Sequence, residues 1–439
     1  MSSHDVDYDN IEMPGECEVS GRYNTFALAL VAVGALAFIG GLFALDNPRR
    51  VWNAYLMGFW FTFTLGLSGP FLLATQYVST GTWGVSIRRV LEAFGTFLAP
   101  AAILGVIMLL GAADILPWIG IEDKDVAHHV KEFVGLKLGF LNMTGLALTT
   151  VIGPIVLLGL FYLIRRNSLK QDESGDPELT DTNKALSAIF LVCFAIVFSL
   201  MSWYWLISLE PMWYATMWQV YNFAALFQSG LALATIVVLL LLREEVFGDF
   251  VGEYQIHSLG QLVFAFTVFY AYIAFSQFML CWYANIPEEA LFYVRRLGGL
   301  TPGDEPGGYG WFTALWLLKF IAPFLILLPQ EIKKNKGNIL YYVCWVIVAV
   351  QIYEIWWWVA FSTSDPGPTT QPTLYLPWLE LLVVGGFVGL FMYVVGRSLS
   401  SANVLPEKDP WLHESLEHNL DHHGHDEHDD EWGEALQES

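Results

Sequence analysis

The stretch FAFTVFYAYIAFSQFMLCWYANIPEE, residues 264–289, is apolar enough to cross a lipid bilayer, yet it carries several hydrogen-bonding side chains. On a helix its polar and small residues recur at steps of three or four and form one stripe: Thr267, Tyr270, Ala274, Gln277, Cys281 and Asn285. Such a stripe either joins helices by hydrogen bonds or lines a path for water and protons. The stretch therefore predicts a transmembrane helix whose polar face is turned into a bundle.

The same length of apolar sequence recurs along the chain. A span needs about 20 apolar residues, and ten segments qualify: 24–45, 51–77, 90–112, 138–164, 185–208, 213–242, 258–285, 309–329, 338–362 and 375–399. Hydrophobic residues make up 55% of the chain and charged residues 15%, with a mean hydropathy of +0.47. These features predict an all-α polytopic transmembrane protein and exclude an ordinary soluble domain.

The net charge of −22 comes mostly from the two tails. We expect an acidic tail at 1–22, a membrane domain at 23–400, and an acidic, His-rich tail at 401–439 that is disordered. Six histidines at 413–432 could bind Zn²⁺ or Ni²⁺ weakly, but they have no fixed spacing. Tails of this charge argue against nucleic acid as a partner.

Positive charges orient the predicted spans. With the N-terminus in the cytoplasm, the inner segments hold thirteen Lys and Arg residues and the outer loops hold seven, which include Arg295 and Arg296. This bias predicts that both termini are cytoplasmic. The first 22 residues are too polar to form a cleavable signal peptide.

The four cysteines, Cys17, Cys193, Cys281 and Cys344, are far apart in sequence. Their spacing excludes the cysteine motifs of iron–sulfur clusters and of c-type haem. No pair of histidines lies within one predicted helix to hold a b-type haem. We therefore expect no metal site, no catalytic residue and no redox chemistry in this chain alone.

Three charged residues lie within predicted spans, where each costs about 2.5–3.5 kcal/mol at the membrane centre. They are Lys319, Glu354 and Glu380. Counting about 1.5 Å per residue places both acids in the outer half of the membrane and Lys319 nearer its middle. Because their helices are joined by a short loop, Lys319 and Glu354 are expected to pair. The pair either locks the two helices together or acts as a protonatable relay.

Other polar residues extend this relay into a candidate proton path. Glu92, His257 and Gln261 form its inner entry, although Glu92 can equally be a helix cap or an interfacial ion pair. The middle consists of Gln228, Tyr270 and Lys319, and the outer exit of Gln277, Glu354 and Glu380.

Similar short motifs occur in two parts of the chain, an internal echo that suggests a second architecture. FWFT (59–62) and FAFT (264–267) are each followed by an arginine pair, and FLAPAAIL (97–104) is similar to FIAPFLIL (320–327). This echo would match the second and third helices to the seventh and eighth, in an inverted repeat of five helices. Some secondary transporters have such repeats.

The stretch at 264–289, together with MSWYWLISLEPMWYATMWQVYNF (201–223) and LKFIAPFLILLP (318–329), resembles the NrfD-like integral membrane proteins. More narrowly, it resembles the second NrfD-like subunit of bacterial alternative complex III. The resemblance implies two four-helix bundles, helices 2–5 and 6–9, plus two extra helices. It also implies a place in the bacterial inner membrane, within a respiratory quinol oxidoreductase.

The resemblance further implies a set of partners and cofactors. The partners are membrane lipid, a paralogous NrfD-like subunit, a multihaem cytochrome c and iron–sulfur subunits, and they can include a terminal oxidase. Haem c and iron–sulfur clusters would be on those partners, and quinone is the ligand associated with the family.

The sequence departs from a quinol-oxidising member of the family. His257 is the one histidine associated with a predicted span, and it is expected on the inner side, away from an outer quinol site. We therefore expect an accessory subunit that conducts protons through its polar interior. Two alternatives remain, a stand-alone secondary transporter and a purely structural anchor for redox subunits.

Overall fold

The computed structural model describes residues 15, 17–124, 128–297, 309–334, 338–360 and 377–415. Helices account for 83% of the structure, and its described residues contain no strand. Within these described residues, ten helices or helical runs are long and apolar enough to cross a membrane. The all-α class and the expected number of spans are therefore confirmed.

The first five spans contain α1 (Gly21–Ala44), α2 (Pro48–Ser79), α3 (Arg88–Gly95), α4 (Leu98–Met108), α5 (Ala112–Ile115), α7 (Met143–Ser174) and α8 (Glu178–Trp205). Of these, α3, α4 and α5 belong to one continuous span, and α6 (His128–Lys137) lies outside the spans. The second five contain α9 (Trp218–Arg243), α10 (Glu253–Ala284), α12 (Tyr309–Trp316), α13 (Ala322–Leu327), α15 (Asn338–Ala360) and α16 (Trp378–Leu399). A π-helical segment, Leu317–Ile321, joins α12 to α13. The short helices α11 (Pro287–Leu297) and α14 (Gln330–Lys334) lie between spans.

Short polar residues and prolines set several helix ends. The side chain of Asn47 accepts the backbone N–H of Arg50 at 3.2 Å, and Pro48 takes the first helical position of α2, where no donor is needed. Asn285 was expected in the polar stripe, but it is the exposed C-cap of α10, with a φ of 47°. Pro287 then begins α11, a helix that the sequence did not predict.

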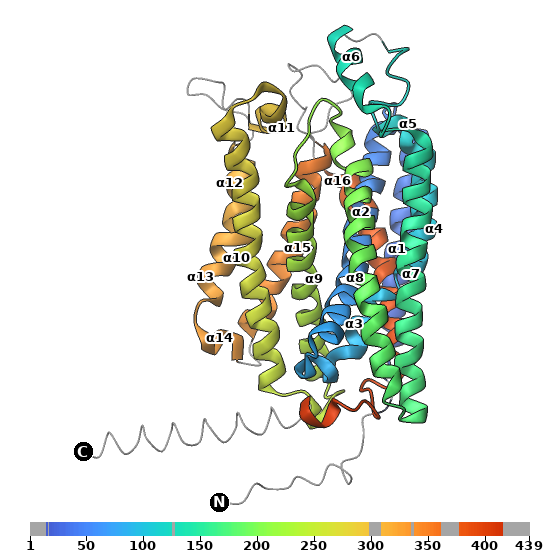
Figure 1. The fold of residues 1–439 in the computed structure, drawn as a ribbon, viewed down its shortest axis with the longest axis vertical. Helices are drawn as coiled ribbons and strands as arrows, with labels where there is room; N and C mark the ends of the chain where they lie inside the picture. Colours follow the sequence, from blue (N-terminus) through green and yellow to red (C-terminus); the bar gives the residue numbers. More distant parts are fainter. Residues whose placement is uncertain are drawn as a thin grey trace, which may run out of the picture.

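The spans pack as two four-helix bundles with two further helices beside them (Figure 1). The first bundle contains α2, the α3–α5 run, α7 and α8, and the second contains α9, α10, the α12–α13 run and α15. Helix α2 also contacts α9 and α15, so it joins the bundles and is buried along nearly its whole length. This grouping differs from the five-helix units suggested by the echo of FWFT and FAFT.

The two further helices, α1 and α16, pack along each other and against α2. At their crossing Gly34 faces Gly386 so closely that a Cβ on Gly34 would lie 2.4 Å from the Cα of Gly386. Small residues allow backbones to approach in this way where lipid supplies no hydrophobic drive for association. The first and last spans therefore meet at a pair of glycines.

The described N- and C-terminal segments lie at one end of the molecule, which we call the terminal end. The N–H of Val404 donates to the carbonyl of Gly15 at 3.4 Å, and buried Arg88 forms an ion pair with buried Asp409. Residues 401–415 were expected to be a solvated tail, but this segment packs on the helix ends because Arg88 needs a counter-charge. The rest of that tail, 416–439, lies outside the described residues, as does nearly all of 1–16.

The opposite, distal end carries α5, α6 and α11 (Figure 1). Helix α6 lies at this end, outside the ten spans. Arg295 and Arg296 were expected in an outer loop, but both are buried in the helix α11, where Glu210 is their counter-charge. Residues 298–308 and 361–376 lie outside the described residues.

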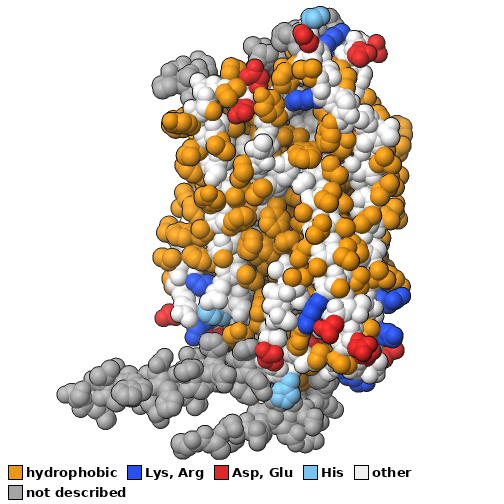
Figure 2. Space-filling view, viewed as in Figure 1, with side chains coloured by type: hydrophobic (Ala, Val, Ile, Leu, Met, Phe, Trp, Pro, Cys, Tyr) orange, Lys and Arg blue, Asp and Glu red, His pale blue; other side chains and the backbone are white. Residues whose placement is uncertain are grey.

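The surface agrees with a multi-pass membrane protein. In Figure 2 hydrophobic side chains cover the middle of the face, whereas Lys, Arg, Asp and Glu gather toward its two ends. On α10, Val268, Phe275 and Met279 are at least 40% exposed, while the polar stripe is turned inward. The exposed apolar band would lie against lipid.

Candidate functional site

The second bundle contains an ion pair that is shielded from solvent. The ammonium group of Lys319, in the π-helical segment, contacts the carboxylate of Glu354 on α15. Both side chains have 0% of their surface exposed. Glu354 lies six residues, or about 9 Å, before the distal end of α15. The pair expected from the sequence therefore forms inside the membrane span.

Donors from neighbouring helices surround the Glu354 carboxylate. Its Oε1 accepts the hydroxyl of Tyr221 at 2.5 Å and that of Tyr270 at 2.6 Å, while its Oε2 faces Lys319. The Lys319 ammonium also donates to Gln351, one turn before Glu354, and lies 4.3 Å from the ring centroid of Tyr270. Glu354 is thus held by groups from α9, α10 and the π-helical segment.

A proline explains the local backbone around Lys319. In an α-helix the carbonyl of Lys319 would accept the N–H of residue 323, but that residue is Pro323 and has no N–H. The side chain of Gln228 donates to this carbonyl at 3.1 Å, and also to Thr267 at 3.1 Å. π-Helical turns are frequent at functional sites. Gln228 therefore joins α9, α10 and the Lys319 segment directly behind the ion pair.

A second group of buried charges lies at the distal end of the same bundle. Arg296 donates to Glu210 at 2.5 Å and to the backbone carbonyls of Trp357 and Trp358 at 3.2 and 2.7 Å. The ring of Trp358 lies 5.4 Å from that of Tyr221, a donor to Glu354. The two charged groups are therefore connected through the end of α15 and one aromatic contact.

The remaining candidates on α10 lie farther from the ion pair. Gln277 is about 10 Å along the helix from Tyr270, toward the distal end, and donates within α10 to the sulfur of Cys281 at 3.4 Å. His257 is buried about 20 Å from Tyr270, toward the terminal end. Both residues thus share a helix with the site but lie above and below it.

Glu380 and Glu92 do not join this site. Glu380, on α16, accepts two hydrogen bonds from Arg50 at 2.9 and 3.2 Å, so the described hydrogen bonds do not join Gln277, Glu354 and Glu380 into one exit. Glu92 pairs with Arg89 at 2.5 Å at the terminal end of the first bundle, as its ion-pair interpretation predicted. A helix interior needs a counter-charge for each buried ion, and these two acids supply it locally.

The structure adds residues that sequence reasoning missed. Tyr221 and Gln351 contact the ion pair directly. Arg296 binds the backbone at the distal end of α15, the helix that carries Glu354. Tyr221 lies seven residues before Gln228 and so shares its helix face, and Gln351 precedes Glu354 by three. These two residues could have been found from their spacing in the sequence. The burial of Arg296 could not, because it depends on α11, which the sequence did not predict.

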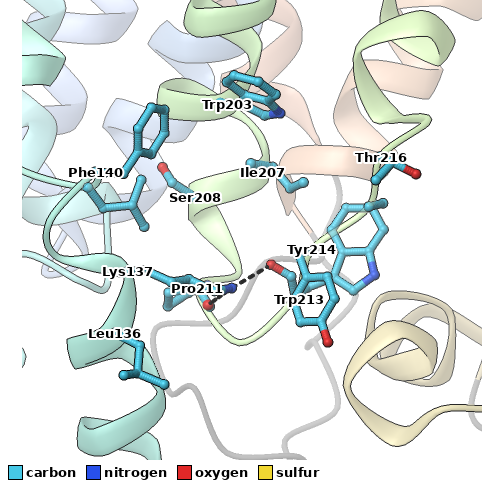
Figure 3. Close-up of a pocket in the computed structure, with 12 residues that line it drawn as sticks. Leu136, Lys137, Phe140, Trp203, Ile207, Ser208, Pro211, Trp213, Tyr214 and Thr216 are labelled. Atoms are coloured by element: carbon cyan, nitrogen blue, oxygen red, sulfur yellow. Dashed lines mark hydrogen bonds between the residues drawn. The ribbon is translucent and has the colours of Figure 1, made fainter.

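A pocket of about 520 Å³ lies at the distal end between α6, the end of α8 and the segment that connects α8 to α9 (Figure 3). Aromatic side chains form much of its wall, including Phe140, Trp203 and Tyr214. Lys137 donates to the backbone carbonyls of Pro211 and Trp213 at 2.7 and 3.0 Å, shown as dashed lines in Figure 3. Burial lowers the pKa of Lys137 to about 8.

The pocket can be tested against the quinone that the resemblance implies. Its aromatic walls have space for a ring, but the described residues lining it include no carboxylate or imidazole that could take the protons of a quinol. Its amine, on Lys137, is already engaged with two carbonyls. The described pocket does not fit quinol oxidation, and no redox step follows from it.

The described residues contain no group of three or more His, Cys, Asp or Glu side chains placed to hold a metal ion. Comparison with known proteins assigns no family, since no family model and no curated protein matches this chain. A functional assignment must therefore start from the buried ion pair and its neighbours.

Proposed function

We propose that this chain is a proton-conducting membrane subunit of a respiratory quinol oxidoreductase of the alternative complex III type. The observation that carries the proton-conducting part is the fully buried Lys319–Glu354 pair, held by two tyrosine hydroxyls. Ionisable groups inside a membrane span are expensive, and those that persist commonly form proton or ion pathways. The association with a redox complex is supported by the resemblance of segments 201–223, 264–289 and 318–329.

The chemistry requires only proton transfers between groups already in contact. A proton moving from the Lys319 ammonium to the Glu354 carboxylate turns two charges into a neutral amine and a neutral acid. In a low-dielectric interior the two forms can lie close in free energy, because each charge costs desolvation while the pair gains attraction. A change in nearby charge can then shift the proton from one residue to the other.

Further side chains lead from the ion pair toward both ends of the bundle. Toward the distal end, Tyr221 links Glu354 to the aromatic residues around Arg296 and Glu210. Toward the terminal end, Gln228 and Thr267 lie behind Lys319 on the inward face of α9 and α10. Water molecules would have to bridge the remaining steps to both ends.

The energy for directed transport would come from the partner subunits. Moving one proton against a membrane potential costs about 2.3 kcal/mol per 100 mV. Quinol oxidation in the complex would supply it, with haem c and iron–sulfur clusters on the cytochrome and iron–sulfur subunits. The bias of basic residues toward the terminal end supports an orientation with both termini in the cytoplasm. The resemblance supports a bacterial inner membrane.

The direct test is the number of protons moved per electron by the intact complex in sealed vesicles. We expect Glu354→Gln to lower this ratio while quinol oxidation continues in uncoupled vesicles. Glu380→Gln is the matched control, because this acid is equally buried but pairs with Arg50 elsewhere. An unchanged ratio for Glu354→Gln would contradict proton conduction at this pair.

Since Glu354→Gln leaves Lys319 without its counter-charge, the double variant Lys319→Gln, Glu354→Gln gives a second test. It removes both titratable groups and leaves two amides that can hydrogen-bond. We expect the number of protons moved per electron to be as low as in Glu354→Gln. Two further outcomes separate the alternatives: transport by the purified chain alone supports a secondary transporter, whereas altered assembly with normal turnover supports an anchor.

A further inference from the structure

A shallow groove of about 670 Å³ lies between α7 and α8, near the terminal end and away from the ion pair of the second bundle. Its lining combines two cationic side chains with polar and apolar ones: Leu163, Arg166, Asn167, Lys170, Leu179, Thr182 and Leu186. No carboxylate is among these described lining residues. The groove therefore presents positive charge beside an apolar floor.

The two cations are neighbours on the surface of α7. Arg166 and Lys170 are four residues apart, so their side chains lie one above the other on the same helix face. Both are exposed, and the described residues supply neither with an ion-pair partner. Other basic residues nearby are engaged, because Arg165 donates to Ser398 and Lys184 pairs with Asp181. The charge at Arg166 and Lys170 is available to a ligand.

The position of the groove corresponds to the headgroup level of a bilayer. Arg166 lies 23 residues after the distal start of α7, or about 35 Å along the helix. The hydrocarbon core is about 30 Å thick, so this side chain would lie just beyond it. Toward the middle of the membrane the same helices expose Tyr162 and Ile189 by 61% and 51%. An amphipathic ligand would thus meet cations at one end and apolar surface at the other.

We propose that this groove binds an anionic phospholipid, with its phosphate-bearing headgroup between Arg166 and Lys170 and its acyl chains along α7 and α8. Guanidinium groups bind phosphate oxygens through paired hydrogen bonds, and Lys adds a point charge. Basic pockets between transmembrane helices are suited to acidic headgroups. The apolar floor favours a lipid over free phosphate. This proposal does not depend on proton conduction.

The test is native mass spectrometry of the full-length, delipidated protein with added phosphatidylglycerol. We expect the double variant Arg166→Gln, Lys170→Gln to bind it about 25-fold more weakly, since each basic group near a membrane surface contributes about fivefold. The matched control is Arg243→Gln, because Arg243 already donates to Asn338 and lies 4.3 Å over the ring of Tyr341. This control should bind like the unmodified protein.

Two further probes identify the ligand chemistry. Phosphatidylcholine should bind weakly, with equal affinity for the unmodified protein and for both variants. Inorganic phosphate at millimolar concentration should not compete with phosphatidylglycerol. Equal affinity for the two lipids, or competition by inorganic phosphate alone, overturns the proposal. If the double variant does not fold, a photoreactive phosphatidylglycerol on the unmodified protein should label the peptides around Leu179 and Leu186. Labelling elsewhere would also overturn it.

Discussion

Lys319 and Glu354 are 35 residues apart in the chain, and their charged groups meet where neither side chain has any exposed surface. Glu354 has donors on both oxygens, while the Lys319 backbone carbonyl is occupied by Gln228. The contact therefore organises four helical segments around one carboxylate. A lipid-facing charge would have no such set of partners.

The first prediction concerns the free energy of unfolding. Lys319→Met removes one charge and leaves Glu354 buried without its partner, which should cost about 3–5 kcal/mol. The double variant Lys319→Met, Glu354→Gln should regain most of this loss, because a neutral amide can still accept the two tyrosine hydroxyls. Chemical unfolding of the four proteins of the cycle in detergent measures the coupling. Additive effects would show that the two residues do not interact.

The second prediction concerns the contact between α1 and α16. Gly34→Ala would place a methyl group against the backbone of Gly386, so we expect a loss of about 1–3 kcal/mol in stability. Gly40→Ala, on the same helix, is the control because nothing lies within 4 Å of its added Cβ. Thermal unfolding in detergent compares the two. Equal midpoints would mean that the helices separate without cost.

A third prediction tests the packing of residues 401–415. Asp409→Asn leaves Arg88 buried without a counter-charge, so the segment should detach more often from the terminal end. A loss of about 1.4 kcal/mol in local stability would raise tryptic cleavage after Lys408 about tenfold. Glu407→Gln is the control, since Glu407 contacts only its near neighbour Asn403 in the described hydrogen bonds. Unchanged cleavage of Asp409→Asn would count against the ion pair.

The fourth prediction concerns pH. Burial lowers the pKa of Lys137 to about 8 from 10.5, so between these values the folded protein holds a neutral amine while the unfolded chain still binds the proton. The free energy of unfolding should therefore rise with pH across this window. Lys137→Met should lack that part of the rise. Thermal unfolding of both proteins from pH 7.5 to 10.5 measures the difference, and parallel curves would contradict it.

Much of the architecture was predictable because lipid imposes a simple rule on sequence. Each span must satisfy its own backbone hydrogen bonds, so length and apolar composition reveal the ten helices. The inward stripe on α10 was predictable for the same reason, since Thr267, Tyr270 and Gln277 avoid lipid. Spacing and a short connection also indicated the pairing of Lys319 with Glu354.

The partners of other charges were not predictable from one-dimensional pattern. Depth along a helix placed Glu380 near Glu354, but depth says nothing of direction around the bundle, and Arg50 proved to be its partner. Arg296 looked like a loop residue because a short amphipathic helix after Pro287 carries no apolar signal of membrane length. Asp409 looked like one acid among many in a tail.

The sequence by itself determined the class of this protein, the number of its spans and the residues whose charge lipid would not tolerate. These properties depend on the free-energy cost of placing polar groups in hydrocarbon, and that cost is set by the sequence of each segment separately. Only the tertiary structure decided which charges neutralise one another, because a counter-ion is chosen by the packing of helices distant in the chain. That choice gathers Lys319, Glu354, Tyr221 and Tyr270 at one point and assigns Glu380 and Glu92 to separate ion pairs.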